Sequence, residues 1–173
     1  MENIQIYNNF LSEEELEQCK LTISKSNWKY GQYSQEINLS TPFWYMELIN
    51  DEFFTIYLKH KIETLMKKKF KVNRVYANGQ TFGQDGSFHQ DDTNDKSTTF
   101  CIYVTPLPDD IFEQVGGHIW FKIPNMNNFS VCVEPLYNRA ISFPSHYFHK
   151  GNAFNRYVQN IRICIAWKLE EII

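Results

Sequence analysis

The 173-residue sequence predicts an α+β fold that is mainly β, with helices packed on one sheet of a sandwich, jelly roll or small barrel. Two observations support this prediction. Amphipathic helical periodicity is confined to the first 70 residues, and the rest of the chain consists of short apolar runs separated by Gly, Pro, Asn and Asp. We expect a single domain over 1–173, in which 1–70 supply an N-terminal strand and helices and 71–170 form the core.

The N-terminal elements have clear local signals. Residues 3–10, "NIQIYNNF", predict a short strand, and Ser12 with Glu15 forms a capping box that starts a helix. A second helix is expected from about 51 to 69, with the lysines of 67–69 in its last turn. The aromatic segment 27–50 predicts a long connection or a short hairpin that could cover a site.

Strands are predicted in the second part of the chain wherever an apolar run lies between turn residues. The runs are "VNRVYANGQ" (72–80), "TTFCIYVTP" (98–106), "HIWFKI" (118–123), "FSVCVEP" (129–135), "RAISFP" (139–144) and "RICIAWKL" (162–169).

Composition argues against several classes of function. The formal net charge is −3, so no basic field supports nucleic-acid binding, and "KKKFK" (67–71) is interpreted as a solvated helix end. The N-terminus lacks signal-peptide features and no run is long enough to span a membrane, so we expect a cytoplasmic protein. The four cysteines form no CxxC pair, and Cys101, Cys132 and Cys164 are expected to be reduced core residues.

A metal site is suggested by "GSFHQDDT" (86–93). In a strand, His89 and Asp91 project from the same face, whereas Asp92 points away and should be dispensable. One imidazole and one carboxylate are two ligands of a 2-His-1-carboxylate triad, which needs one further histidine. A chance His-x-Asp pair in a polar loop is the alternative interpretation.

Four histidines besides His89 could supply the third ligand. His60 is expected to face solvent on the second helix, which leaves three candidates. His146 and His149 follow an apolar strand in "FPSHYFHKG", and His118 begins a strand after two glycines. His149 is favoured because it lies nearest the last strand, at the expected rim of the barrel.

The last strand contains an arginine among apolar residues. "IRICIAWKL" is apolar except for Arg162 and Lys168, and alternation places Arg162 with the small residues Cys164 and Ala166. The large residues of the other face should pack on the helices. A buried arginine needs an anionic partner, for which a bound carboxylate and a structural Arg–Glu bridge are both candidates.

Five segments, in order, resemble the iron(II)/2-oxoglutarate-dependent dioxygenases, and most closely their prolyl 4-hydroxylase-like branch. The segments are "RVYANGQTFGQDGSFHQDD" (74–92), "FCIYVTP" (100–106), "GGHIWF" (116–121), "NRAISFPSHYFHKG" (138–151) and "RICIAW" (162–167). The similarity covers about residues 70–169, and it implies a double-stranded β-helix (jelly-roll) core. It also implies iron(II), 2-oxoglutarate as cosubstrate, and ascorbate as a candidate further cofactor.

The resemblance implies a role for individual residues. It makes His89, Asp91 and His149 the iron ligands and catalytic centre, Arg162 and Tyr103 the partners of the distal carboxylate of 2-oxoglutarate, and Tyr76 a residue that lines the pocket.

The sequence departs from the family pattern at three places. Cys164 replaces a serine and His118 a glutamate, and the spacing from His149 to Arg162 is 162 − 149 = 13, longer than is usual in this branch. Arg156, inside the resulting loop, is therefore a rival for the anion-binding role.

The resemblance favours a prolyl residue of a peptide or protein as substrate. A free amino acid, another small molecule and a nucleic-acid base are alternatives, and so is a non-catalytic, cupin-like module that binds a metal or ligand. Six aromatic residues would form either a groove for an extended chain or part of the core: Trp28, Tyr30, Tyr33, Phe43, Trp44 and Tyr45.

Overall fold

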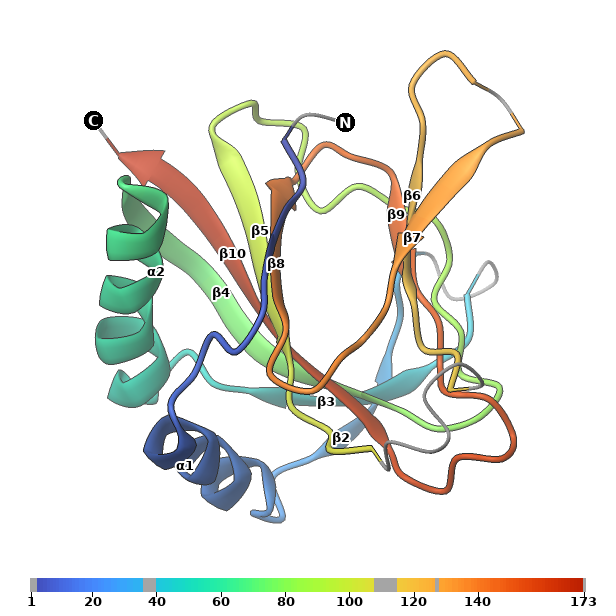
Figure 1. Cartoon of the computed structure of the whole chain (residues 1–173), viewed down its shortest axis with the longest axis horizontal. Coiled ribbons are helices and arrows are strands. Elements are labelled where there is room, and N and C mark those ends of the chain that lie inside the picture. The colour runs from blue at the N-terminus through green and yellow to red at the C-terminus, as the bar shows by residue number, and fades with distance from the viewer. Residues whose placement is uncertain (1–2, 36–39, 108–114, 127, 173) are drawn as a thin grey trace.

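The computed structural model describes residues 3–35, 40–107, 115–126 and 128–172, whose strands form two antiparallel sheets (Figure 1). The larger sheet has seven strands in the order β1-β8-β5-β10-β4-β3-β2. Their bounds are β1 Gln5–Tyr7, β2 Lys29–Gln32, β3 Phe43–Glu47, β4 Lys69–Gln80, β5 Ser97–Tyr103, β8 Ala140–Pro144 and β10 Arg162–Ile172. The smaller sheet has the order β7-β6-β9, with β6 Ile119–Lys122, β7 Ser130–Val133 and β9 His149–Gly151.

Helix α1 (Glu13–Ile23) begins as predicted. The Ser12 hydroxyl accepts a hydrogen bond from the Glu15 N–H at 3.3 Å, and the Glu15 carboxylate accepts one from the Ser12 N–H at 2.7 Å. Both capping-box bonds are therefore present, and they satisfy backbone donors that a helix start leaves unpaired.

The second helical segment differs from its prediction. It starts with a π-helical stretch, η1 (Phe53–Leu58), continues as α2 (Lys59–Met66), and ends at Lys67, whose φ of 54° is left-handed. The lysine run is not its last turn, because Lys69 already belongs to β4. The buried Glu63 carboxylate accepts a hydrogen bond from the Phe70 N–H at 2.8 Å, which holds the reversal in place.

The main core lies between the helices and the outer face of the larger sheet (Figure 1). Along β10, Ile165, Trp167 and Leu169 belong to this core, and the Trp167 indole N–H donates to the Phe54 carbonyl at 3.0 Å. Cys164 and Ala166 point to the opposite face, into the space between the two sheets. The predicted alternation along the last strand is confirmed, as is the jelly-roll fold with helices on one sheet.

Two details of the strands were missed or wrong. The three-residue strand β9 was not anticipated. Of the two alternatives for 27–50, the short hairpin is present, because β2 and β3 pair antiparallel. Cys132 is exposed on β7, so its expected core position is wrong.

Among the described residues, no helix has the length and apolar character needed to cross a membrane.

Candidate metal centre and adjoining cavity

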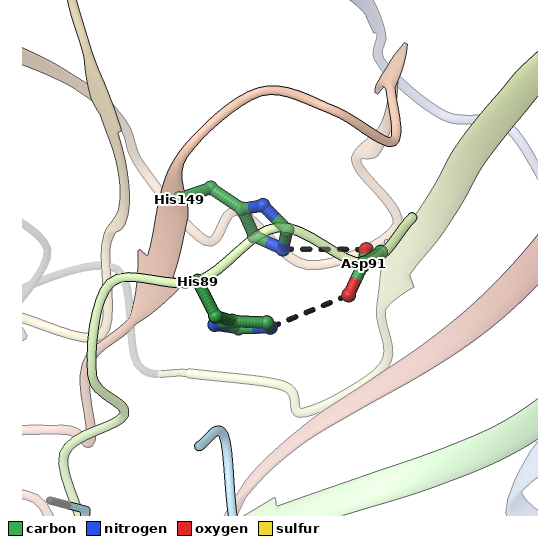
Figure 2. Close-up of side chains that lie close together, drawn as sticks. All are labelled: His89, Asp91 and His149. Carbon is green, nitrogen blue, oxygen red and sulfur yellow. Dashed lines mark ion pairs between the residues drawn. The ribbon is translucent and has the colours of Figure 1, made fainter. Parts of the chain in front are cut away.

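Paired backbone hydrogen bonds bring two histidines together from segments 60 residues apart. The His89 N–H donates to the His149 carbonyl at 3.0 Å, and the His149 N–H donates back at 2.9 Å. Opposite residues of an antiparallel pair project from the same face, and the two imidazole centroids are 4.5 Å apart (Figure 2).

The Asp91 carboxylate completes the cluster (Figure 2). Its backbone N–H donates to the Ser145 carbonyl at 2.9 Å, which anchors the loop that carries it. Asp91 Oδ1 lies 3.3 Å from His89 Nε2, and Oδ2 lies 3.4 Å from His149 Nε2. One ligand atom from each of the three residues lies within 4.8 Å of the others, so the three side chains could hold one metal ion.

The protonation states suit a metal site. The Nδ1 atoms of His89 and His149 lie 2.9 and 2.8 Å from the Ser87 and Tyr147 carbonyls. A carbonyl only accepts, so each Nδ1 donates a proton to it, and each Nε2 is the ring nitrogen that faces the cluster. Burial lowers the pKa of His149 to about 4, so this imidazole is neutral at pH 7.

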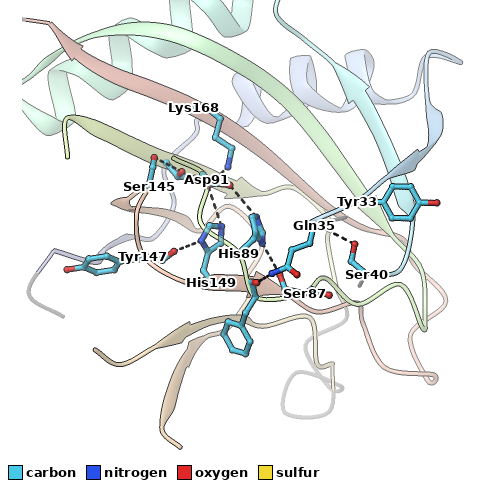
Figure 3. A network of polar contacts seen from close by, with 12 residues as sticks. Tyr33, Gln35, Ser40, Ser87, His89, Asp91, Ser145, Tyr147, His149 and Lys168 are labelled. Atoms are coloured by element: carbon cyan, nitrogen blue, oxygen red, sulfur yellow. Dashed lines mark hydrogen bonds and ion pairs between the residues drawn. The ribbon is translucent and has the colours of Figure 1, made fainter. Parts of the chain in front are cut away.

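Asp91 is ionised in the folded protein. Burial acts to raise its pKa, but the Lys168 ammonium is the leading opposing influence, and the pKa is held well below its usual range. Asp91 Oδ2 accepts a hydrogen bond from the Lys168 ammonium (Figure 3). The same oxygen accepts a second hydrogen bond from the Thr99 hydroxyl at 2.6 Å. These bonds leave Oδ1 as the freer oxygen for a metal.

Lys168 was missed as a site residue. The alternation that places Arg162 on the inner face of β10 also places Lys168 there, six residues on, and this signal was available in the sequence.

A cavity of about 350 Å³ opens beside the cluster, and Arg162 lies in its wall. Arg162 is 4% exposed; its Nε–H donates to the Gly117 carbonyl at 2.7 Å and its Nη1 to Gln80 Oε1 at 2.8 Å. No carboxylate forms an ion pair with Arg162 among the described residues, so they supply no structural Arg–Glu bridge. A guanidinium has five N–H groups, and Arg162 uses two of them in these bonds. Three N–H groups therefore remain to bind an anion.

Two polar atoms in the cavity wall lack a hydrogen-bond partner within the described part of the chain, namely Tyr103 Oη and Asn78 Oδ1. The Tyr103 ring lies 5.0 Å from the Arg162 guanidinium carbon. Buried polar groups are rarely left unpaired, so these atoms are suited to a polar ligand. Tyr76 also lines the cavity, where its ring lies 3.9 Å from the Arg74 guanidinium carbon.

Several candidates lie elsewhere. His60 is exposed on α2, the His118 ring lies against Trp120, and neither His118 nor His146 lines the cavity or joins the described metal cluster. Arg156 is exposed, with its guanidinium 5.7 Å from the Phe82 ring, so it is not in the cavity wall.

The aromatic residues of 28–45 divide between the two alternatives. Tyr33 and Phe43 line the cavity, whereas Trp28 packs against the main core. Tyr30 and Trp44 contact one another on the outside of the hairpin.

Comparison with known proteins gives structural matches alone, since no family model and no curated protein matches the sequence. A Trichoplax adhaerens prolyl hydroxylase, solved with a hypoxia inducible factor peptide, superposes with a TM-score of 0.72 at 20% identity, covering 98% of this chain and 84% of that one. A Burkholderia pseudomallei 2OG-Fe(II) oxygenase family protein gives 0.74 at 9% identity, with coverages of 97% and 85%. A Pseudomonas putida prolyl-4-hydroxylase gives 0.68 at 10% identity, with coverages of 99% and 94%. The chain therefore has the double-stranded β-helix fold of the 2-oxoglutarate/iron(II) oxygenases.

Proposed function

We propose that the protein is an iron(II)- and 2-oxoglutarate-dependent dioxygenase that hydroxylates its substrate. One observation carries the proposal: the cluster of His89, Asp91 and His149 shares a cavity with Arg162, a buried guanidinium without a carboxylate partner in the described residues. A metal triad and an anion-binding arginine in one cavity suit a metal-chelating dicarboxylate.

The donor set fits iron(II). Two imidazoles and one carboxylate suit a divalent first-row metal and leave coordination positions open. When bound, iron(II) and 2-oxoglutarate supply oxidative hydroxylation, in which dioxygen is consumed and succinate and carbon dioxide are released.

The residues of the chain bind and orient. His89 and His149 are held by their Nδ1 contacts with backbone carbonyls, and Asp91 by Thr99 and Lys168, so the three ligands need little rearrangement. Rigid placement of this kind lowers the entropic cost of bringing reactants together.

Arg162 and Tyr103 would hold the distal carboxylate of 2-oxoglutarate. The three free N–H groups of Arg162 allow a bidentate pair, and the unpaired Tyr103 hydroxyl can donate a further bond. Gly151 makes room for this arrangement, because a Cβ atom there would lie 3.3 Å from Arg162 Nη2.

The first candidate substrate is a prolyl residue of a peptide or protein. A free amino acid or another small molecule is the second candidate, and a nucleic-acid base is the third. The prolyl hydroxylases of Trichoplax and Pseudomonas with the same fold support the first, as do Tyr33 and Phe43 at the cavity. The positive charge of the cavity favours a small molecule that carries an anionic group.

The test is oxygen-dependent conversion of 2-oxoglutarate to succinate by protein reconstituted with iron(II), with and without a prolyl peptide. His89→Ala should lose iron binding and succinate formation, whereas the matched control His146→Ala should keep both, because His146 lies outside the cluster. Iron binding without any interaction with 2-oxoglutarate would favour a cupin-like binding module instead.

A further inference from the structure

A second, partly buried cation lies on the inner face of β10. The Lys168 side chain is 20% exposed, and its ammonium pairs with Asp91 Oδ2 (Figure 3). The ammonium also lies 5.7 Å from the Tyr76 ring. Lys168 pairs in register with Arg74 on β4 and Thr99 on β5, whereas Arg162 pairs with Gln80. Six residues of strand span about 20 Å, so the two cations lie toward opposite ends of the cavity wall.

Lys168 carries its charge at neutral pH. Its ammonium donates a hydrogen bond to Asp91 Oδ2, so the two groups form a salt bridge. The Asp91–Lys168 contact is therefore an ion pair whose charges cancel.

The cavity holds a surplus positive charge. Its described lining includes three cations, Arg74, Arg162 and Lys168, against the single carboxylate of Asp91. Arg74 is compensated from outside the cavity by Glu47, whose Oε1 lies 3.1 Å from Arg74 Nε. The charges that remain are those of Arg162 and Lys168 against Asp91, which sum to 2 − 1 = +1. The net charge of the whole chain, by contrast, is −3.

Metal and cosubstrate do not remove this surplus. Iron(II) adds two positive charges and 2-oxoglutarate two negative charges, so the loaded cavity keeps its +1. A buried charge without a partner is costly, which leaves the remaining component, the substrate, to supply the anion.

The geometry at Lys168 agrees with the charge count. An ammonium has three N–H groups, and within the described residues Lys168 donates only to Asp91 Oδ2. A divalent metal on Asp91 would weaken that bond by withdrawing charge from the carboxylate. Two N–H donors, mostly shielded from solvent, are then available beside the metal.

We propose, building on the function above, that Lys168 determines substrate specificity by binding an anionic group, and that the substrate is a free carboxylic acid. An internal prolyl residue of a peptide is uncharged and would leave the surplus positive charge of the loaded cavity without a counter-ion. The competing interpretation is that Lys168 only orients the Asp91 carboxylate and does not bind the substrate.

The experiment uses two probes that differ in one charge, N-acetyl-L-proline and N-acetyl-L-prolinamide. Each is titrated anaerobically into the protein loaded with iron(II) and 2-oxoglutarate, and binding is followed through the charge-transfer absorption of the bound cosubstrate. The acid should bind at least about tenfold more tightly than the amide at low ionic strength, equivalent to about 1.4 kcal/mol.

Three variants separate the two roles of the lysine. Lys168→Gln keeps a donor for Asp91 but removes the charge, and should abolish the preference; Lys168→Arg should retain it. Lys71→Met, which removes an exposed lysine of β4 outside the cavity lining, should change nothing.

Equal binding of the two probes by the unmodified protein, binding of neither, or a preference that survives in Lys168→Gln would overturn the inference. If Lys168→Gln fails to fold or to bind iron, the unmodified protein and Lys168→Arg decide the matter, because both must prefer the acid. Failure of the proposed function is distinct: the charge-transfer absorption would then not appear when 2-oxoglutarate is added.

Discussion

Replacing Arg162 by glutamine tests the assignment of the cosubstrate site. The guanidinium is held by Gly117 and Gln80 through two of its five N–H groups, which leaves three for a carboxylate. Glutamine is uncharged, so the substitution removes the charge-assisted pair. A hydrogen bond to a charged group contributes about 1.5–3 kcal/mol, so loss of the pair should cost about 3 kcal/mol.

That energy corresponds to roughly a 100-fold increase in the Kd for 2-oxoglutarate. The assay is calorimetric titration of 2-oxoglutarate into protein loaded with manganese(II), which suits the same ligands without supporting turnover. The Kd for the metal should change less than threefold, because Arg162 does not contact the metal cluster, and this split distinguishes local loss of an anion site from general damage. Thermal unfolding of each variant reports separately on folding.

Arg156→Gln is the matched control. Arg156 lies in the loop before β10 and was the rival candidate, but its side chain is exposed and outside the cavity wall. This variant should bind 2-oxoglutarate within twofold of the unmodified protein. The reverse pattern, with Arg156→Gln impaired and Arg162→Gln normal, would refute the assignment.

Asp91→Ala should abolish iron binding, measured by metal analysis of reconstituted protein. Asp92→Ala should keep it, because the Asp92 carboxylate instead accepts hydrogen bonds from the Asn94 N–H and the Ser97 hydroxyl; equal loss in both variants would contradict the ligand assignment. Gly151→Ala should raise the Kd for 2-oxoglutarate several-fold and leave iron affinity unchanged, because its Cβ would crowd Arg162; an unchanged Kd would show that the guanidinium has room to shift. Glu63→Gln should reduce stability at pH 7 by up to about 3 kcal/mol, because two lysines and a backbone N–H outweigh burial and lower the pKa of Glu63 from 4.5 to about 2. The depressed folded-state pKa means that this stability is present above pH 4.5 and is lost as pH falls toward 2, so urea unfolding should show the two proteins converging over that range; a constant difference would contradict the cause.

Long strands and local caps were predictable because their signals lie within a few residues. The alternation along β10 correctly separated Trp167, on the helix side, from Arg162 and Cys164 on the inner side. Ser12 and Glu15 likewise marked the start of α1 through a motif spanning four residues. Such signals do not depend on tertiary contacts with distant parts of the chain.

Other features depended on distant partners and could not be predicted locally. Strand β9 is three residues long and exists because His149 pairs with Phe121 on one side and bridges to His89 on the other. The end of α2 depends on the bond from Phe70 to Glu63, which the continuing lysine run obscures. The local pattern was correct in both cases, but tertiary hydrogen bonding decided the boundary.

The chemistry of the site depends on the register of one strand. Because side chains alternate along a strand, a one-residue slip of β10 would move Arg162 and Lys168 to the helix side and place Trp167 in the cavity. The present register instead aligns Lys168 with Thr99 of β5, so that both donors meet the same oxygen of Asp91. The buried Trp167 and its neighbours favour this register by packing on the helices, and the core thereby places both cations in the cavity. Substitutions at Trp167 should therefore disturb 2-oxoglutarate and iron binding together, although Trp167 touches neither proposed site.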